Sequence, residues 1–176
     1  ESGDLVPPGA FIPAAERFGL MPRIDRWVVK QVFDLIKQDY EALVLGGYRF
    51  AINLSGGSVN DEDTLVYISQ KMSEFRIPDG MISFEITETA AIANLSSATH
   101  FIRTLKKAGC RFSLDDFGSG LSSFAYLKNL PVDYLKIDGA FIRDLADDPI
   151  DLAMVQAINQ IGQVMGLKTI AEFVES

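Results

Sequence analysis

The sequence predicts an α/β fold built around a parallel sheet, and three observations support this prediction. First, five short segments rich in β-branched and aromatic residues alternate with helical stretches, which is the pattern of βαβ units. Second, the apolar residues of those helical stretches recur at intervals of three and four. Third, Gly109 and Gly166 follow two of the helices, where a left-handed closing residue is expected. The 176 residues are predicted to form one domain or part of one.

The five predicted strands span residues 48–54, 81–87, 110–116, 134–138 and 168–174. The helix before the first strand carries an apolar stripe, which we expect to pack on the sheet. The residues of this stripe are Ile24, Trp27, Val28, Val32 and Leu35. The later helices carry comparable stripes around Ile68, Ile102 and Ile158.

A polar or charged side chain lies near the C-terminal end of every predicted strand. These residues are Asn53, Glu85, Asp115, Lys136 and Glu172. They alternate with bulky apolar residues, which suit burial under helices. Because a (β/α) barrel carries its chemistry at the C-terminal ends of its strands, we expect a TIM-like (β/α) barrel with a site at that edge. The barrel would be incomplete, with about five of eight strands. A buried polar network that only holds the strand ends together is the alternative.

The predicted site is rich in carboxylates. Carboxylates gathered in a partly dry cavity repel one another, so they must be protonated or neutralised by cations. Lys136 supplies one positive charge, and divalent metal ions are the natural source of the rest. Oxygen ligands suit Mg²⁺ or Mn²⁺, and the adjacent Asp115 and Asp116 could hold two ions. We therefore expect a two-metal site for Mg²⁺ or Mn²⁺.

Composition and charge argue against several classes of protein. The net charge of −8 and the pI of about 4.6 argue against a nucleic-acid polymer as partner. No apolar run approaches the roughly 20 residues that span a bilayer, and the N-terminal residues lack the pattern of a signal peptide. The single cysteine, Cys110, fits a reducing compartment. We expect a cytoplasmic domain, whose parent protein could still be anchored to the inner membrane.

Six segments carry motifs that can be compared with known families. They are residues 11–16 (FIPAAE), 52–55 (INLS), 84–89 (FEITET), 113–123 (SLDDFGSGLSS), 130–138 (LPVDYLKID) and 170–175 (IAEFVE). In order and spacing they resemble the EAL family of cyclic di-GMP phosphodiesterases. The resemblance covers essentially the whole chain and implies hydrolysis of this bacterial second messenger to linear pGpG. A catalytically inactive cyclic di-GMP receptor or regulatory module is the alternative.

The resemblance also implies roles for the residues at the strand ends. Asn53, Glu85 and Asp115 would bind the first metal ion. Asp115 would bridge to a second ion held by Asp116. Lys136 would orient or activate the attacking water.

Further implied roles concern the surroundings of the metal ions. Glu172 would complete the second-metal and water environment, with Glu175 close behind. Glu88 would fix a glycine-rich loop that in this family couples dimer contacts to the metal site. The loop residues are Gly118, Ser119 and Gly120. A homodimer is therefore expected, and an upstream GGDEF-type or sensory domain commonly accompanies the family.

The tripeptide Glu41-Ala42-Leu43 matches the letters of the family signature. It falls at the end of a predicted helix that enters the first strand, so Glu41 is expected roughly 15–20 Å from the strand ends that carry the site. The family's signature glutamate lies upstream of the FIPAAE segment. We therefore expect residues 1–176 to be a partial EAL domain that lacks the first strands, with that glutamate, and the last strand.

Overall fold

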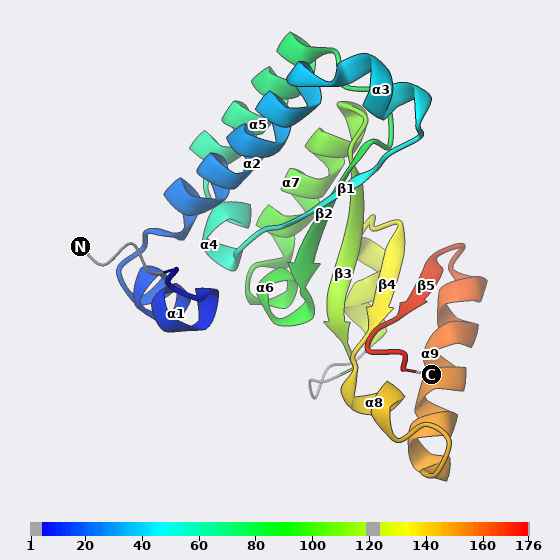
Figure 1. The fold of residues 1–176 in the computed structure, drawn as a ribbon. Helices are drawn as coiled ribbons and strands as arrows, with labels where there is room; N and C mark the ends of the chain where they lie inside the picture. Colours follow the sequence, from blue (N-terminus) through cyan, green and yellow to red (C-terminus); the bar gives the residue numbers. More distant parts are fainter. Residues whose placement is uncertain (1–4, 119–123, 176) are drawn as a thin grey trace.

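The computed structural model describes residues 5–118 and 124–175. Five parallel strands form one sheet in the sequential order β1-β2-β3-β4-β5 (Figure 1). Sequential parallel strands joined by helical crossovers are the arrangement of a (β/α) barrel, here an open part of one. The prediction of five strands is confirmed, with ends that differ by up to a few residues. The strands are β1 (Phe50–Asn53), β2 (Ile82–Thr87), β3 (Arg111–Phe117), β4 (Tyr134–Ile137) and β5 (Lys168–Ala171).

Helices connect the strands, and the long ones cover the sheet. α2, α5 and α7 lie side by side, and α9 packs on β4 and β5 (Figure 1). No helix of the described residues is both long and apolar enough to cross a membrane. The helices are α1 (Pro8–Arg17), α2 (Met21–Gln38), α3 (Tyr40–Leu45), α4 (Gly56–Val59), α5 (Glu62–Phe75), α6 (Glu88–Ala93), α7 (Leu95–Lys107), a 3-10 helix (Phe124–Asn129), α8 (Ala140–Arg143) and α9 (Pro149–Val164).

The hydrophobic core lies between the sheet and this helical layer. Alternate strand residues fill it, among them Phe84 and Phe112, whose ring centroids are 5.6 Å apart. Phe101 of α7 meets Phe112 edge-on at 6.3 Å. Because side chains alternate along a strand, the residues between the core positions, such as Glu85 and Lys136, face the other side of the sheet.

The predicted sheet-facing stripe of α2 is right only in part: Val28 and Val32 are partly buried against the core, whereas two other members are exposed. Trp27 is 61% exposed and Leu35 is 46% exposed. The helix is rotated so that Phe33 enters the core and packs edge-on against Phe75 of α5, at 5.8 Å. Because a charged residue, Asp25, lies within the buried stripe, the pattern of apolar residues alone does not predict this stripe. The buried residues are Met21, Asp25, Val29, Phe33 and Ile36.

The helix that carries Glu41 is separate from α2. α2 ends at Gln38, and α3 begins after Asp39, so the single long helix expected from the sequence is broken there. Figure 1 shows α3 at the end of the sheet where the strands begin, away from the arrowheads. Glu41 is exposed and belongs to α3, and its distance from the charged strand ends stays a prediction.

Candidate active site

Lys136 of β4 lies at the centre of a cluster of carboxylates at the C-terminal ends of the strands. Its Nζ atom is 2.7 Å from Glu172 Oε1, 2.8 Å from Asp115 Oδ1 and 2.9 Å from Glu85 Oε2. The four side chains are 13–19% exposed, so these ion pairs are largely shielded from solvent. Neighbouring strands therefore bring together four residues that are far apart in the sequence.

The register of β1 and β2 places Asn53 beside this cluster. Asn53, the last residue of β1, is paired directly with Glu85 of β2. Residues paired across parallel strands share a face of the sheet. The exposed side chain of Asn53 therefore lies on the same face as Glu85.

Asp115 and Asp116 would point to opposite faces in a regular strand, but both contribute to one group. Carboxylate oxygens of Asp115, Asp116 and Glu172 lie within 4.8 Å of one another. Asp116 has a left-handed φ of 52°, and the pairing of β3 with β4 shifts register between Leu114 and Phe117. Aspartate tolerates this conformation better than most residues. The local irregularity turns two successive carboxylates toward the same site.

The environment of Lys136 keeps its ammonium group charged. Burial by itself lowers the pKa of Lys136, but hydrogen bonds to Asp115, Glu172 and Glu85 more than offset this effect, so the pKa is raised. A lysine with a raised pKa donates hydrogen bonds and does not accept a proton at neutral pH. Lys136 is therefore a fixed positive charge in the site.

The donor set fits a divalent cation. With all groups ionised, the described cluster holds one ammonium group, that of Lys136, and four carboxylates, those of Glu85, Asp115, Asp116 and Glu172. Carboxylate oxygens are hard ligands of the kind that bind divalent ions such as Mg²⁺ and Mn²⁺. Asp115, Asp116 and Glu172 are close enough to bind one ion together.

Burial and the neighbouring carboxylates disfavour the charged form of Asp116, which predicts an effect of pH on stability. The pKa of Asp116 is raised above its ordinary value of 3.8, first by burial and then by the nearby charges of Asp115, Asp138 and Glu172. Asp116 therefore binds its proton more tightly in the folded state than in the unfolded state, so protonation of Asp116 stabilises the fold. This contribution is complete below the unfolded-state pKa and is lost as pH rises through the folded-state pKa.

We accordingly expect Asp116→Asn to raise the melting temperature at neutral pH without divalent ions, and to flatten the pH dependence of that temperature in the range above pH 3.8. Thermal unfolding in EDTA across this range measures both effects. Asp147→Asn, which removes an exposed acid remote from the cluster, is the control. A lower melting temperature for Asp116→Asn at neutral pH would contradict the expectation.

Glu88 contacts the glycine-rich loop after β3. Glu88, the first residue of α6, is 4% exposed, and its Oε2 accepts a hydrogen bond from the backbone N–H of Gly118 at 3.1 Å. Its Oε1 accepts a hydrogen bond of 2.5 Å from the hydroxyl of Tyr126. Burial and this hydrogen bond raise the pKa of Tyr126, so the phenol remains a donor. The predicted loop residues Ser119 and Gly120 lie outside the described residues.

Two residues at this edge of the sheet were not identified from the sequence. Asp138 lies two residues after Lys136, close enough to raise the pKa of Asp116, and its Oδ1 accepts a hydrogen bond from Ala140 N at 2.8 Å. Its spacing of two from Lys136 was the signal that could have revealed it. Glu175, which was predicted to lie close to the site, is exposed and is not among the described carboxylates that converge.

Phe173, the second missed residue, controls the direction of the chain after β5. It follows Glu172 and has a φ of 50°, which is rare for an aromatic residue. Its ring packs so closely on Gly139 that a Cβ added there would lie 2.1 Å from Phe173 Cδ2. The guanidinium of Arg143 lies 4.9 Å from the ring centroid. These contacts join the residue after Glu172 to the segment that follows β4.

This contact predicts a loss of stability and its rescue. Gly139 has a φ of −58° and a ψ of −20°, which alanine adopts freely, so Gly139→Ala tests the steric contact alone. Because Phe173 is 61% exposed and its ring can rotate outward, we expect the variant to lose about 0.5–1.5 kcal/mol of unfolding free energy. Adding Phe173→Gly removes the ring and should restore most of this loss. Chemical denaturation of both single variants and the double variant measures the coupling; a double variant as unstable as Gly139→Ala would refute it.

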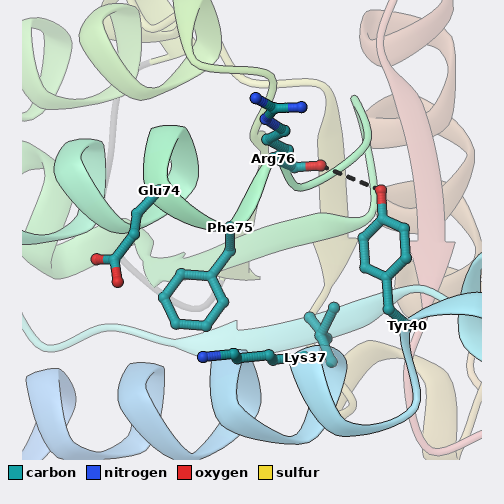
Figure 2. Close-up of a pocket in the computed structure, with 6 residues that line it drawn as sticks. Lys37, Tyr40, Glu74, Phe75 and Arg76 are labelled. Carbon is teal, nitrogen blue, oxygen red and sulfur yellow. Dashed lines mark hydrogen bonds between the residues drawn. The ribbon is translucent and has the colours of Figure 1, made fainter.

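A separate cavity of about 480 Å³ lies between the C-terminal ends of α2 and α5 (Figure 2). The hydroxyl of Tyr40 donates a hydrogen bond to the backbone oxygen of Arg76 there, at 3.3 Å. Both helices end where β1 and β2 begin, so this cavity is at the opposite edge of the sheet from the carboxylates. Its lining residues are Ile36, Lys37, Tyr40, Glu74, Phe75 and Arg76.

The fold and the site together define a class of protein. Parallel strands in sequential order, with converging carboxylates and a lysine at their C-terminal ends, are the arrangement of (β/α)-barrel proteins with a polar site at that edge. The model of the EAL domain family matches residues 1–176, and the chain belongs to this family.

Two curated relatives are similar over nearly the whole chain. The cyclic di-GMP phosphodiesterase PdeB of Shewanella oneidensis is 44% identical over 174 residues, which cover 99% of this chain and 20% of PdeB. The cyclic di-GMP phosphodiesterase PdeF of Escherichia coli (strain K12) is 35% identical over 176 residues, covering 100% of this chain and 23% of PdeF. The chain thus spans about a fifth of the length of these relatives.

Two solved structures extend the comparison to the fold. The FimX EAL domain from Pseudomonas aeruginosa bound to c-di-GMP is similar with a TM-score of 0.88 and 29% identity, covering 99% of this chain and 69% of that chain. The PaMucR phosphodiesterase in complex with c-di-GMP is similar with a TM-score of 0.88 and 33% identity, covering 98% of this chain and 74% of that chain.

Proposed function

We propose that this EAL domain hydrolyses one phosphodiester bond of cyclic di-GMP, giving linear pGpG, with Mg²⁺ or Mn²⁺ in a two-metal site. The observation that carries this proposal is the carboxylate cluster around Lys136 at the C-terminal ends of the strands. Two further observations support it. Relatives of 44% and 35% identity are named cyclic di-GMP phosphodiesterases, and similar EAL structures contain c-di-GMP.

The proposal assigns the ligands as follows. Asn53, Glu85 and Asp115 would hold one ion, and Asp115 would share a second with Asp116 and Glu172. When bound, the ions would polarise the phosphate and lower the pKa of a coordinated water. The carboxylates are already grouped at the strand ends, so little rearrangement of the backbone is required.

Lys136 would orient the attacking water and stabilise the negative charge that develops on the phosphate. As an ammonium group held among three carboxylates, it would act as a hydrogen-bond donor, and a carboxylate such as Glu172 would accept the proton of the water. Glu88 would be a positioning residue, since it contacts the loop through Gly118 N and does not reach the cluster itself.

We propose further that residues 1–176 are part of a longer EAL barrel that includes the signature glutamate and further strands. Similar EAL chains are covered only to 69% and 74%, and β1 and β5 each pair with one strand among the described residues. A homodimer, an upstream GGDEF-type or sensory domain, and a cytoplasmic location remain predictions from the family resemblance and the composition.

The proposal is tested with the intact protein, cyclic di-GMP and Mn²⁺, by following pGpG chromatographically. We expect the wild type to form pGpG and Glu85→Gln to lose this activity, because the amide keeps the shape of the side chain but not its charge. Binding of cyclic di-GMP without cleavage would refute hydrolysis and show that the protein is a cyclic di-GMP receptor. A protein that neither binds nor cleaves cyclic di-GMP would refute both the enzyme and the receptor.

A further inference from the structure

Asp25 is a charged side chain inside the buried stripe of α2. It is 5% exposed, and its Oδ2 accepts hydrogen bonds from the backbone N–H of Ser55 at 2.9 Å and from the hydroxyl of Ser58 at 2.6 Å. A buried carboxylate without such partners would be strongly destabilising. Both partners belong to the segment that leaves β1 and enters α4, so Asp25 anchors that segment to α2.

The anchored segment begins two residues after Asn53, the last residue of β1. On one side, Leu54 N donates a hydrogen bond to Glu85 O at 2.8 Å, which continues the pairing of β1 with β2. Among the described residues, β2 is the only strand paired with β1. Asp25 therefore supplies, from the helical layer, a second restraint on the end of β1.

We propose that Asp25 is a positioning residue for the candidate metal site: by holding Ser55 and Ser58, it fixes the end of β1 so that Asn53 stays beside Glu85 on the same face of the sheet. This inference deepens the proposed function and rests on its assignment of Asn53 as a metal ligand. Asp25 does not touch the site itself, so its effect must pass through the backbone between Asn53 and Ser55.

The adjacent residue of α2 provides a matched control. Arg26 Nη1 lies 2.7 Å from Asp61 Oδ2 and 3.1 Å from Thr64 Oγ1, at the start of α5. Like Asp25, Arg26 joins α2 to a later segment through two side-chain hydrogen bonds. Its partners follow the end of β1 by several residues, so Arg26→Ala should weaken the packing of α2 without moving Asn53.

The test measures the affinity of the intact protein for Mn²⁺ by electron paramagnetic resonance of the free ion, together with the melting temperature. Loss of an outer residue that orients a metal ligand typically weakens metal binding about 10–100-fold, and we expect this for Asp25→Ala. Asp25→Asn keeps an oxygen acceptor of the same shape and should lose much less. Arg26→Ala should lower the melting temperature and leave Mn²⁺ affinity unchanged.

A double-substitution cycle separates positioning from general destabilisation. In an Asn53→Ala background, Asp25→Ala should cause no further loss of Mn²⁺ affinity, because the ligand that it positions is already gone. An equal loss in both backgrounds, or an unchanged affinity in Asp25→Ala alone, would overturn the inference.

Failure of this inference is distinguishable from failure of the proposed function. The affinity measurement needs no cyclic di-GMP, so a wild type that binds Mn²⁺ but does not form pGpG refutes hydrolysis and leaves the Asp25 result decisive. A wild type that binds no Mn²⁺ refutes both.

Discussion

Lys136→Met is expected to lower the rate of cyclic di-GMP hydrolysis by about 10²–10³-fold. Methionine keeps much of the length of the side chain and removes its charge. In the wild type the ammonium group donates to three carboxylates on three different segments, at 2.7–2.9 Å, and its raised pKa keeps it charged. Removing it takes away the positive charge that the proposal places beside the reacting phosphate.

The same substitution should affect metal binding in the opposite direction. Lys136 competes with a divalent ion for Glu85, Asp115 and Glu172, so Lys136→Met should bind Mn²⁺ at least as tightly as the wild type. Single-turnover hydrolysis at saturating Mn²⁺ then isolates the chemical step, with Lys136→Arg as the variant that retains the charge. A Lys136→Met rate within tenfold of wild type, or a large loss of Mn²⁺ affinity, would contradict the assignment.

Asp115→Asn is expected to have the largest effect on metal binding, with Mn²⁺ affinity falling about 100-fold or more and hydrolysis falling with it. The proposal assigns Asp115 to both metal ions, and, like Glu172, it takes part in both groups of contacts at the site. It pairs with Lys136 at 2.8 Å and also belongs to the group with Asp116 and Glu172. The amide preserves the shape of the side chain, but it removes the charge that would bridge two ions.

Asp133→Asn is the matched control for this experiment. Asp133 also links strands through charge, since its Oδ2 accepts a hydrogen bond from Phe112 N at 2.9 Å and its Oδ1 pairs with Lys106 at 2.8 Å. It lies at the opposite edge of the sheet, where β3 and β4 begin. We expect Asp133→Asn to lose stability and to retain Mn²⁺ affinity. If Asp115→Asn binds Mn²⁺ as tightly as the wild type, Asp115 is not a metal ligand.

Much of the fold could be predicted because strand alternation is a local property. Residues 82–87 alternate between apolar and polar side chains, which indicated both the buried face of β2 and the position of Glu85. Helical periodicity was less successful for α2. Its expected stripe included Val28 and Val32, which pack against the core, but also Trp27 and Leu35, which are exposed. A helix can rotate by a fraction of a turn to bury Asp25 with hydrogen-bond partners, and periodicity alone does not reveal those partners.

The sequence by itself determined the alternating strands and helices, and it placed a polar residue at each strand end. Only the tertiary structure decided which atoms meet. Lys136 joins Glu85, Asp115 and Glu172 because of the strand register, and Asp116 joins the carboxylate group because its backbone turns to a φ of 52°. These contacts depend on neighbours that are distant in the sequence, and local patterns carry no information about them.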